Sequence, residues 1–349
     1  MQTINLIEPA DGWVSHLLQK HHLPKQNPDA ENSSAVSGFQ WNNLEVVNAD
    51  RSHPHPITFS WERIGRRWST LSYDLVIAPT PDFDKDVMVT SGISKPTVDI
   101  GHLLLGTRYY WKVVARKGEK AIAESPVRAL ETDATPPRWL RVPGMTNVRD
   151  LGGWPLPNGK RIRQGMAYRS SEMNGHLRIT ERGRKILEDF LKIRTDLDLR
   201  GDFDGASPVL DPDKVTWINA PISPYDCVAD MTFRDEYLKI FKLFADPDRY
   251  PILFHCVGGA DRGGTVALLL NALLGKDREL LIHDYELTTL SVWGERSRWS
   301  EQFKALLDAL RGYHDDPDDI NAQAENYVKS IGLSDAELQS IRDLLITSS

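Results

Sequence analysis

The 349-residue sequence predicts a multidomain protein, in which an all-β sandwich is followed by an α/β domain with a central, mostly parallel sheet. Short segments of alternating apolar and polar residues between positions 39 and 133 are typical of a β-sandwich. Near residue 255 an apolar segment, a glycine-rich loop and an apolar helical segment follow one another, as in α/β proteins. The Thr- and Pro-rich stretch 132–137 separates the two patterns. We therefore expect an N-terminal extension over residues 1–38, a β-sandwich over 39–133 and an α/β domain over 134–349.

The composition excludes some classes of partner. The net charge is −7 and no basic run is present, which argues against nucleic acid or an anionic membrane as the main partner. No segment approaches the length of a membrane span. Residues Met1–Trp13 contain no apolar segment of a signal peptide, although a leader removed before this point would leave periplasmic or extracellular export open. The sequence therefore leaves the compartment undetermined.

The β-rich region contains several alternating strand patterns. Residues 57–61 and 72–78 alternate, and residues 103–115 carry the pattern Leu-x-x-Gly-Thr-x-Tyr before a long strand. With Trp61 on an early strand and Tyr109 in this corner, the region resembles a fibronectin type III module. The resemblance implies that the Trp and Tyr side chains fill the core. The alternative is an exposed aromatic patch that binds protein or carbohydrate.

The stretch around Cys256 has the pattern strand, glycine-rich loop, helix. The apolar residues 252–254 predict a buried strand, and residues 265–274 are apolar on nearly every side, which is typical of a buried helix. Loop N–H groups and a helix N-terminus together bind an oxyanion, and the guanidinium of Arg262 can contact two phosphate oxygens. The same positive field favours the thiolate of Cys256. A thiolate in a phosphate-binding loop is a nucleophile directed at phosphorus.

His255-Cys256, five residues and then Arg262 resemble the signature of the cysteine-dependent phosphatases. The closer resemblance is to a bacterial tyrosine-phosphatase branch with Asp before the Arg, here Asp261, which is sometimes active on phosphoinositides. The further matches to this branch are Asn147-x-Arg149-Asp150-x-Gly152-Gly153, Tyr168-Arg169-Ser170, Asp198-Leu199-Arg200 and Asp284-Tyr285. The resemblance covers roughly residues 140 to 345.

The resemblance implies a role for each residue of the loop. Cys256 is the nucleophile, Arg262 and the loop N–H groups bind phosphate, and no metal or cofactor is required. The phosphate-binding positions are Val257, Gly258, Gly259, Ala260 and Gly263. His255 either tunes the Cys by hydrogen bonding or fills the core. The other cysteine, Cys227, is expected to be a plain loop thiol, since two cysteines do not make a disulfide framework.

Two residues of the loop depart from the family pattern. Ala260 stands where the family usually has Lys, which removes a charge from the phosphate site. Gly263 stands where the family usually has Thr or Ser, which removes a hydroxyl that would donate a hydrogen bond to the departing Cys sulfur. Both changes concern the rate and the choice of substrate more than the identity of the nucleophile.

The general acid has several candidates. Asp261 lies in the loop itself, and Asp226 lies thirty residues before Cys256, a spacing at which many cysteine phosphatases place their acid on a mobile loop. Asp230 is a third candidate, and each of the three could instead cap a turn or helix. Arg169 and Arg200 either line the site or form structural salt bridges.

Helices are expected over residues 180–192 with Thr180 as N-cap, over 232–245, over 282–310, and after a capping box that begins at Ser334. The functional prediction is a phosphomonoester hydrolase that acts through a phosphocysteine, with protein phosphotyrosine as the first substrate class. Phosphoinositides or inositol phosphates are the alternative with the same site. A binding protein with an impaired phosphatase site is the alternative of another class.

Overall fold

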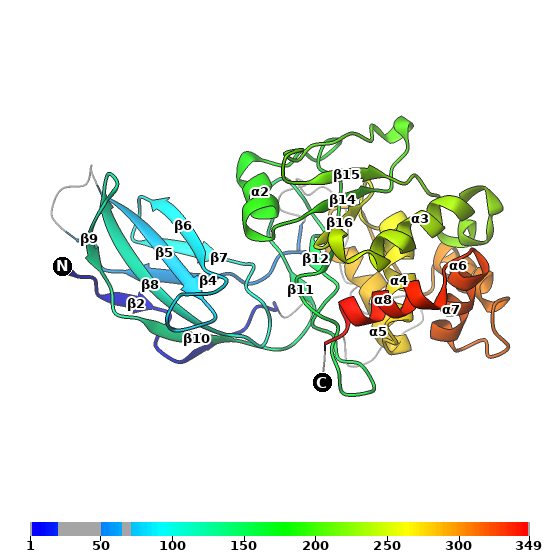
Figure 1. Ribbon diagram of the computed structural model, residues 1–349, viewed down its shortest axis with the longest axis horizontal. Helices are drawn as coiled ribbons and strands as arrows, with labels where there is room; N and C mark the ends of the chain where they lie inside the picture. The colour runs from blue at the N-terminus through cyan, green and yellow to red at the C-terminus, as the bar shows by residue number, and fades with distance from the viewer. Residues whose placement is uncertain (1, 20–49, 65–70, 348–349) are drawn as a thin grey trace. The chain divides into compact units, whose positions relative to one another are not determined.

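The computed structural model describes residues 2–19, 50–64 and 71–347 (Figure 1). The chain forms two compact units. The first consists of residues 1–19 and 54–136, and the second of residues 20–53 and 137–349. The described residues 50–53 therefore belong to the second unit, although they precede most of the first unit in the sequence.

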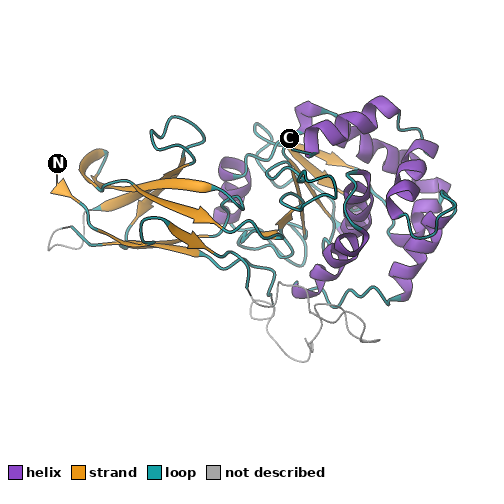
Figure 2. Cartoon of the chain, turned by 90° about the horizontal axis from the view of Figure 1, so that it is seen from below, coloured by secondary structure: helices purple, strands orange, loops and turns teal. Residues whose placement is uncertain are grey.

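The described residues of the first unit form strands arranged in two sheets (Figure 2). The strands are β1 (Gln2–Thr3), β2 (Leu6–Glu8), β3 (Trp13–Ser15), β4 (Ile57–Trp61), β5 (Ser72–Ala78), β6 (Met88–Ile93), β7 (Thr97–Ile100), β8 (Arg108–Lys117), β9 (Lys120–Glu124) and β10 (Arg128–Thr132). The larger sheet has the order β1-β9-β8-β10-β3, with β5 pairing with β8 and β6 pairing with β5, and the smaller sheet has the order β2-β4-β7.

Both sheets contribute to one hydrophobic core. The Phe59 ring of the smaller sheet and the Trp111 ring of the larger sheet meet edge to face, 5.0 Å between centroids. Trp61 is 1% exposed, as expected for a core residue. The Tyr109 hydroxyl accepts a hydrogen bond from the Leu104 backbone N–H at 3.0 Å, which fixes the corner before β8.

Residues 2–15 differ from the expected N-terminal extension. In the structure β1 pairs with β9, β2 with β4, and β3 with β10, so this segment is part of the two sheets. Strands of two or three residues are too short to show an alternating pattern, so no sequence signal predicted them. The rest of the predicted extension, residues 20–38, lies outside the described residues.

The second unit is built on a six-stranded sheet with the order β11-β12-β13-β16-β14-β15 (Figure 1). The strands are β11 (Arg138–Trp139), β12 (Arg149–Asp150), β13 (Ala167–Ser170), β14 (Thr195–Asp198), β15 (Thr216–Asn219) and β16 (Ile252–His255). β16 pairs in parallel with both β13 and β14, and His255 lies in register with Ser170 and Asp198. The loops that follow these three strands therefore leave the sheet at one edge, where α/β proteins bind ligands.

Helices accompany the sheet (Figure 2). They are α2 (Glu181–Lys185), α3 (Arg234–Ala245), α4 (Arg262–Leu273), α5 (Arg278–Glu286), α6 (Glu301–Arg311), α7 (Ile320–Ser330) and α8 (Asp335–Leu345). The predicted caps are confirmed, since Thr180 accepts from the Gly183 N–H and Ser334 forms a capping box with Glu337. Residues 263–273 of α4 are all buried, as predicted. No helix among the described residues combines the length and apolar character that a membrane span requires.

The continuous helix predicted over residues 282–310 is wrong. α5 ends at Glu286 and is followed by a 3₁₀ turn, η7 (Leu287–Leu290), and residues 291–300 are not helical before α6 begins. Gly294 has a φ of +94°, and the Ser300 side chain accepts the Phe303 N–H as the N-cap of α6. The interruption is important for the site, because it carries Trp293 and Arg296.

Candidate active site

The predicted phosphate-binding loop joins β16 to α4. β16 ends at His255, Cys256 follows it with 3% of its surface exposed, and α4 begins at Arg262. The apolar residues of β16 and α4 bury both ends of the loop in the core of the unit. The loop is therefore held at a fixed position at the edge of the sheet.

Three successive carbonyl groups of the loop are hydrogen-bonded from outside. The Glu172 N–H donates to the Val257 carbonyl at 3.0 Å. Nδ2 of Asn147 donates to the carbonyls of Gly258 and Gly259 at 3.1 and 3.2 Å. Because a trans peptide points its C=O and the next N–H in opposite directions, the N–H groups of residues 258–260 face the inner side of the loop. Such a group of converging N–H donors binds an anion.

Gly259 cannot be replaced by another residue in this loop conformation. Its φ is +63°, and a Cβ atom there would lie 2.2 Å from the Ser170 carbonyl oxygen. Glycine tolerates both this backbone angle and the close approach of β13. The position identified from sequence as the inner glycine of the loop is thus required by the backbone.

A buried ion network supports the loop from behind. Arg169 donates to the Gly259 carbonyl at 2.6 Å and to Asp284 at 2.8 Å, and Arg149 donates to the same carboxylate at 3.1 Å and to Asn147 Oδ1. Burial would raise the pKa of Asp284, but the two guanidinium groups outweigh it and hold that pKa far below its usual range. Arg169 therefore positions the loop, and Asp284 holds both guanidinium groups in place.

His255 and Arg200 have structural partners on β14 or beside it. Nε2 of His255 lies 2.9 Å from Oδ1 of Asp196, and both residues are 1% exposed. Burial lowers the pKa of His255, but the Asp196 carboxylate raises it by more than burial lowers it, so the net shift is upward. Arg200 is fully buried and pairs with Asp198 at 2.8 Å and Glu172 at 3.1 Å. Arg200 thus forms the structural salt bridges that were its alternative. His255 lies buried in the core, with Asp196 as its partner.

Arg262 contacts a carboxylate that the sequence analysis did not consider. Nη1 of Arg262 donates to Oδ2 of Asp204 at 2.6 Å, and the two side chains are 18% and 28% exposed. Burial lowers the pKa of Arg262, whereas the negative charges at Cys256 and Asp204 raise it, and the net shift is upward. Asp204 ends the 3₁₀ turn η3 (Asp202–Asp204), which follows the Asp198-Leu199-Arg200 motif at the end of β14. β14 lies beside β16 in the sheet, so an acidic turn after β14 ends near the loop after β16. The acidic residues of this turn were the sequence signal that could have identified Asp204 as a partner of Arg262.

The three predicted acids have different environments. Asp261 accepts two hydrogen bonds from Arg296, at 2.8 and 3.0 Å, and a third from the Tyr225 hydroxyl. Asp226 is exposed on the 3₁₀ turn η4 (Tyr225–Ala229). Asp230 accepts the Thr232 N–H at 2.8 Å as the N-cap of the next turn, η5 (Met231–Phe233), and this hydrogen bond lowers its pKa. Asp230 therefore has the capping role that was its alternative.

Tyr225 connects the turn that carries Asp226 to the predicted phosphate-binding loop. Its backbone N–H donates to the Thr265 hydroxyl at 3.0 Å, and its phenol contacts Asp261 and, at 3.1 Å, the Tyr285 hydroxyl. Burial, together with these two neighbours, raises the Tyr225 pKa, so the phenol stays protonated as a donor. Tyr225 was not among the residues predicted for the site, although it precedes a predicted acid.

The non-helical segment 291–300 borders the loop. A Cβ atom on Gly258 would lie 3.0 Å from Cγ of Trp293, so the half-buried indole packs against this glycine. The Trp293 ring also meets the ring of His176 edge to face at 5.4 Å. Ala260 is 1% exposed and adds no charge to the loop, whereas Arg296 places a guanidinium beside Asp261.

Comparison with known proteins identifies the family. The model of a tyrosine phosphatase family matches residues 140–347, which include the loop and its supporting motifs. The chain belongs to the tyrosine phosphatase family.

Individual relatives are distant. A tyrosine-protein phosphatase of Nostoc commune is 26% identical over 133 residues, covering 31% of this chain, and the chain spans 43% of the length of that relative. Similar solved structures include the core catalytic domain of the PP-IP phosphatase Siw14 from S. cerevisiae in complex with citrate, 17% identical with a TM-score of 0.27 over 39% of this chain and 77% of that one. Another structure of the Siw14 catalytic core is 17% identical with a TM-score of 0.29, over 46% of this chain and 88% of that one.

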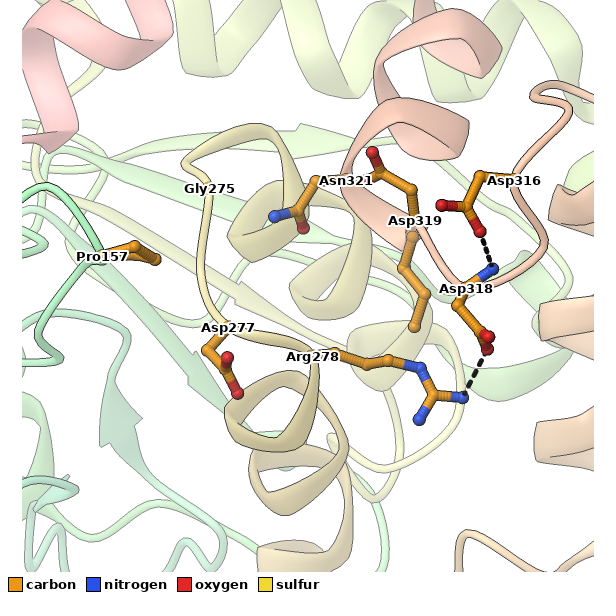
Figure 3. A pocket seen from close by; sticks show the side chains of 9 residues that line it. Pro157, Gly275, Asp277, Arg278, Asp316, Asp318, Asp319 and Asn321 are labelled. Atoms are coloured by element: carbon orange, nitrogen blue, oxygen red, sulfur yellow. Dashed lines mark hydrogen bonds and ion pairs between the residues drawn. The ribbon is translucent and has the colours of Figure 1, made fainter.

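The same unit contains a hollow of about 340 Å³ that includes no residue of the loop (Figure 3). Its lining residues are Pro157, Gly275, Asp277, Arg278, Asp316, Asp318, Asp319, Ile320 and Asn321. The aspartates have structural partners: Asp277 caps α5, Asp319 caps α7, and Asp316 accepts the Asp318 N–H at 2.9 Å. The Asp318 carboxylate lies 3.6 Å from Arg278. We therefore assign the other three aspartates to helix and turn capping and Asp318 to this ion pair.

Proposed function

We propose that this protein hydrolyses phosphomonoesters, with protein phosphotyrosine as its substrate class and Cys256 as its nucleophile. The observation that carries the proposal is the loop itself. Three successive carbonyls are bonded outward around a buried cysteine, and Arg262 stands at the end of the loop. This arrangement offers N–H donors and a guanidinium to the equatorial phosphate oxygens and a sulfur to the phosphorus.

The reaction takes two steps. In the first, the Cys256 sulfur forms a bond to phosphorus while the bond from phosphorus to the leaving oxygen breaks, and a carboxylic acid protonates that oxygen. In the second, the same group, now a carboxylate, accepts a proton from water. The water oxygen bonds to phosphorus, the S–P bond breaks, and phosphate and the thiolate are released.

We assign the acid to Asp226. Both oxygens of Asp261 already accept hydrogen bonds from Arg296, so Asp261 would have to break an ion pair before donating a proton. Asp226 is exposed to an incoming substrate, and its neighbour Tyr225 fixes the turn on Asp261 and on Thr265 in the first turn of α4. This tether supports a position within reach of the leaving group.

The charge around the loop supports phosphotyrosine over inositol phosphates. Arg149 and Arg169 share Asp284, Arg200 pairs with Asp198, and Arg296 pairs with Asp261. Each of these guanidinium groups already contacts a carboxylate, and Ala260 supplies no further cation. Arg262 also has a carboxylate partner, Asp204, but that ion pair is partly exposed, so a ring with several phosphates would find few partners besides Arg262. The half-buried indole of Trp293 beside Gly258 suits an aryl group.

The test compares Cys256→Ser with Cys227→Ser on phosphotyrosine peptides, phosphoinositide vesicles and inositol phosphates. We expect Cys256→Ser to abolish phosphate release while still binding inorganic phosphate, and Cys227→Ser to keep activity. Near-wild-type turnover of Cys256→Ser would exclude the covalent mechanism. Faster phosphate release from inositol phosphates than from phosphotyrosine peptides would show that inositol phosphates are the substrate class. Binding of phosphate without hydrolysis of any substrate would favour the binding-protein alternative.

For the first unit we propose a β-sandwich of the fibronectin type III kind that contacts protein or carbohydrate. The hydrogen bond from the Leu104 N–H to the Tyr109 hydroxyl supports this assignment, because such a tyrosine corner is a feature of these sandwiches. The buried Trp61 and the core shared by two sheets agree with it. Trp13→Ser, which removes an exposed aromatic side chain of this unit, should alter the choice of protein substrate more than the turnover of a small aryl phosphate.

A further inference from the structure

We propose that Ser52 is a positioning residue for the phosphate-binding loop and acts on it through Asn147. Ser52 lies in the segment Asp50–His53, which we call the strap. The strap precedes most of the β-rich unit in sequence but belongs to the unit that contains the loop. The proposal rests on the proposed function of this loop as a phosphate site.

The strap is fixed by its own turn and by the end of η7. Oγ and the backbone N–H of Ser52 both donate to Asp50 Oδ1, at 2.6 and 2.9 Å, so the residue closes a turn on its own chain. The Arg51 backbone N–H donates to the Leu290 carbonyl at 2.8 Å. Ser52 is 0% exposed, which means that its hydroxyl has no water to replace a lost partner.

The Ser52 hydroxyl is the acceptor for the backbone of Asn147. The Asn147 N–H donates to Ser52 Oγ at 2.9 Å, and Oγ1 of the preceding Thr146 lies 3.2 Å from the same atom. Asn147 has a φ of +58°, a left-handed conformation that asparagine tolerates better than most other residues with a side chain. The hydrogen bond from the strap is one of the contacts that hold the backbone in this conformation.

The side chain of Asn147 connects this backbone position to the loop. It donates to the carbonyls of Gly258 and Gly259 and is itself held by Arg149 on Oδ1. If the backbone of Asn147 shifts, Nδ2 loses its position against these carbonyls. The N–H groups that follow them in the chain then face the phosphate less persistently. A change at Ser52 should therefore weaken oxyanion binding without touching the oxyanion.

The experiment compares Ser52→Ala with a matched control, Thr195→Val. Thr195 is 1% exposed and donates to the Arg249 carbonyl at 2.8 Å, but it begins β14 and so lies at the end of the sheet away from the loop. Amide hydrogen exchange of residues 257–261 and binding of inorganic phosphate are measured for both variants. Ser52→Ala should speed loop exchange by roughly fivefold to a hundredfold, the range expected when a buried donor loses its acceptor, and should weaken phosphate binding severalfold. Thr195→Val should leave both unchanged.

A merely structural role gives a different outcome. In that case Ser52→Ala would lower the midpoint of thermal unfolding, as Thr195→Val does, while the folded protein bound phosphate as tightly as the wild type. That result would overturn the proposal. Ser52→Cys, which keeps the shape of the side chain but replaces the hydroxyl oxygen by a weaker acceptor, should reproduce the effect of Ser52→Ala on the loop.

The wild-type protein provides a test without any variant. Coupling is reciprocal, so if the strap helps the loop to bind phosphate, then saturating phosphate must slow amide exchange at Arg51 and Asn147. Unchanged exchange at both amides under saturation would contradict the proposal. These readouts need no turnover: a protein that binds phosphate with this coupling but hydrolyses no phosphomonoester would refute the proposed function and leave the role of Ser52 intact.

Discussion

The carboxylate of Asp204 lies 2.6 Å from Nη1 of Arg262, so the guanidinium predicted to bind phosphate already holds an anionic partner. Asp204 is on the turn that follows β14, and Arg262 begins α4 after β16. Both are partly exposed, which means that an incoming phosphate can compete for the same donor. We infer that substrate binding exchanges one anion for another at Arg262.

Replacing Asp204 by Asn should therefore tighten phosphate binding. A partly exposed ion pair contributes up to about 1 kcal/mol, so the inhibition constant of inorganic phosphate should fall roughly twofold to fivefold. Asp202→Asn is the control, since Asp202 is exposed on the same turn. An inhibition constant that falls equally in both variants would indicate a general charge effect, and a weaker affinity in Asp204→Asn would show that the carboxylate supports the phosphate site.

The assignment of the acid to Asp226 predicts a dependence on the leaving group. Loss of a general acid costs about 10²–10⁴-fold in rate, most for a poor leaving group. Asp226→Asn should therefore lose much more activity on an alkyl phosphate than on an activated aryl phosphate. Asp261→Asn breaks the ion pair with Arg296 and should lose similar activity on both substrates. Asp230→Asn alters only a turn cap and should leave the ratio of alkyl to aryl phosphatase activity unchanged. If Asp261→Asn shows the leaving-group dependence instead, Asp261 is the acid.

Because Gly263 has no hydroxyl, we predict that hydrolysis of the phosphocysteine, the second step, is slow. A Cβ atom at this position would lie 4.0 Å from the Cys256 sulfur with no other neighbour that close, so a hydroxyl fits there. Removal of one such donor elsewhere costs roughly 2–4 kcal/mol of transition-state stabilisation, although Thr265 or a backbone N–H can compensate in part. The phosphocysteine should accumulate, giving a burst of leaving group in rapid-mixing kinetics. Gly263→Thr should raise the steady-state rate without enlarging the burst, whereas no burst and no effect would make Gly263 a neutral variation.

From the burial of Lys276 we predict how the free energy of unfolding depends on pH. Lys276 is 0% exposed, its ammonium lies 3.9 Å from the centre of the Trp154 ring, and no hydrogen-bond partner reaches Nζ among the described residues. Burial lowers its pKa from 10.5 to about 7, with Arg149 and Arg169 acting in the same direction and Asp284 against it. Between these two pH values the unfolded chain holds one more proton, so the free energy of unfolding rises with pH, by up to about 1.4 kcal/mol per unit.

Lys276→Met keeps an apolar side chain against Trp154 and should remove this slope. The free energy of unfolding, measured with urea at pH 7, 8 and 9, should then rise less with pH than in the wild type. Lys304→Met is the control, because Lys304 also lies near a Trp ring, at 5.8 Å, but is exposed. Equal slopes for wild type and Lys276→Met would mean that the buried amine does not titrate in this range.

The sequence by itself determined the elements whose signals are local. The apolar residues 252–254, the glycines and the apolar residues 265–274 predicted β16, the loop and α4, and so placed Cys256 and Arg262 together. The caps at Thr180 and Ser334 also depend on residues three positions apart, which is why they could be read directly. The family motifs included Asn147, Arg149, Arg169 and Asp284, but they did not predict that these residues support the loop or which contacts each one makes.

Only the tertiary structure decided those contacts. Asn147 and Gly258 are 111 residues apart, and Arg262 and Asp204 are 58 apart. Such pairs meet because β16 lies between β13 and β14, and the order of strands in a sheet depends on packing throughout the unit. The contacts made by residues 291–300 are of the same kind. Gly294 and the N-cap Ser300 are local signals for the break, but the contacts of Arg296 with Asp261 and of Trp293 with Gly258 depend on where the tertiary structure places this segment.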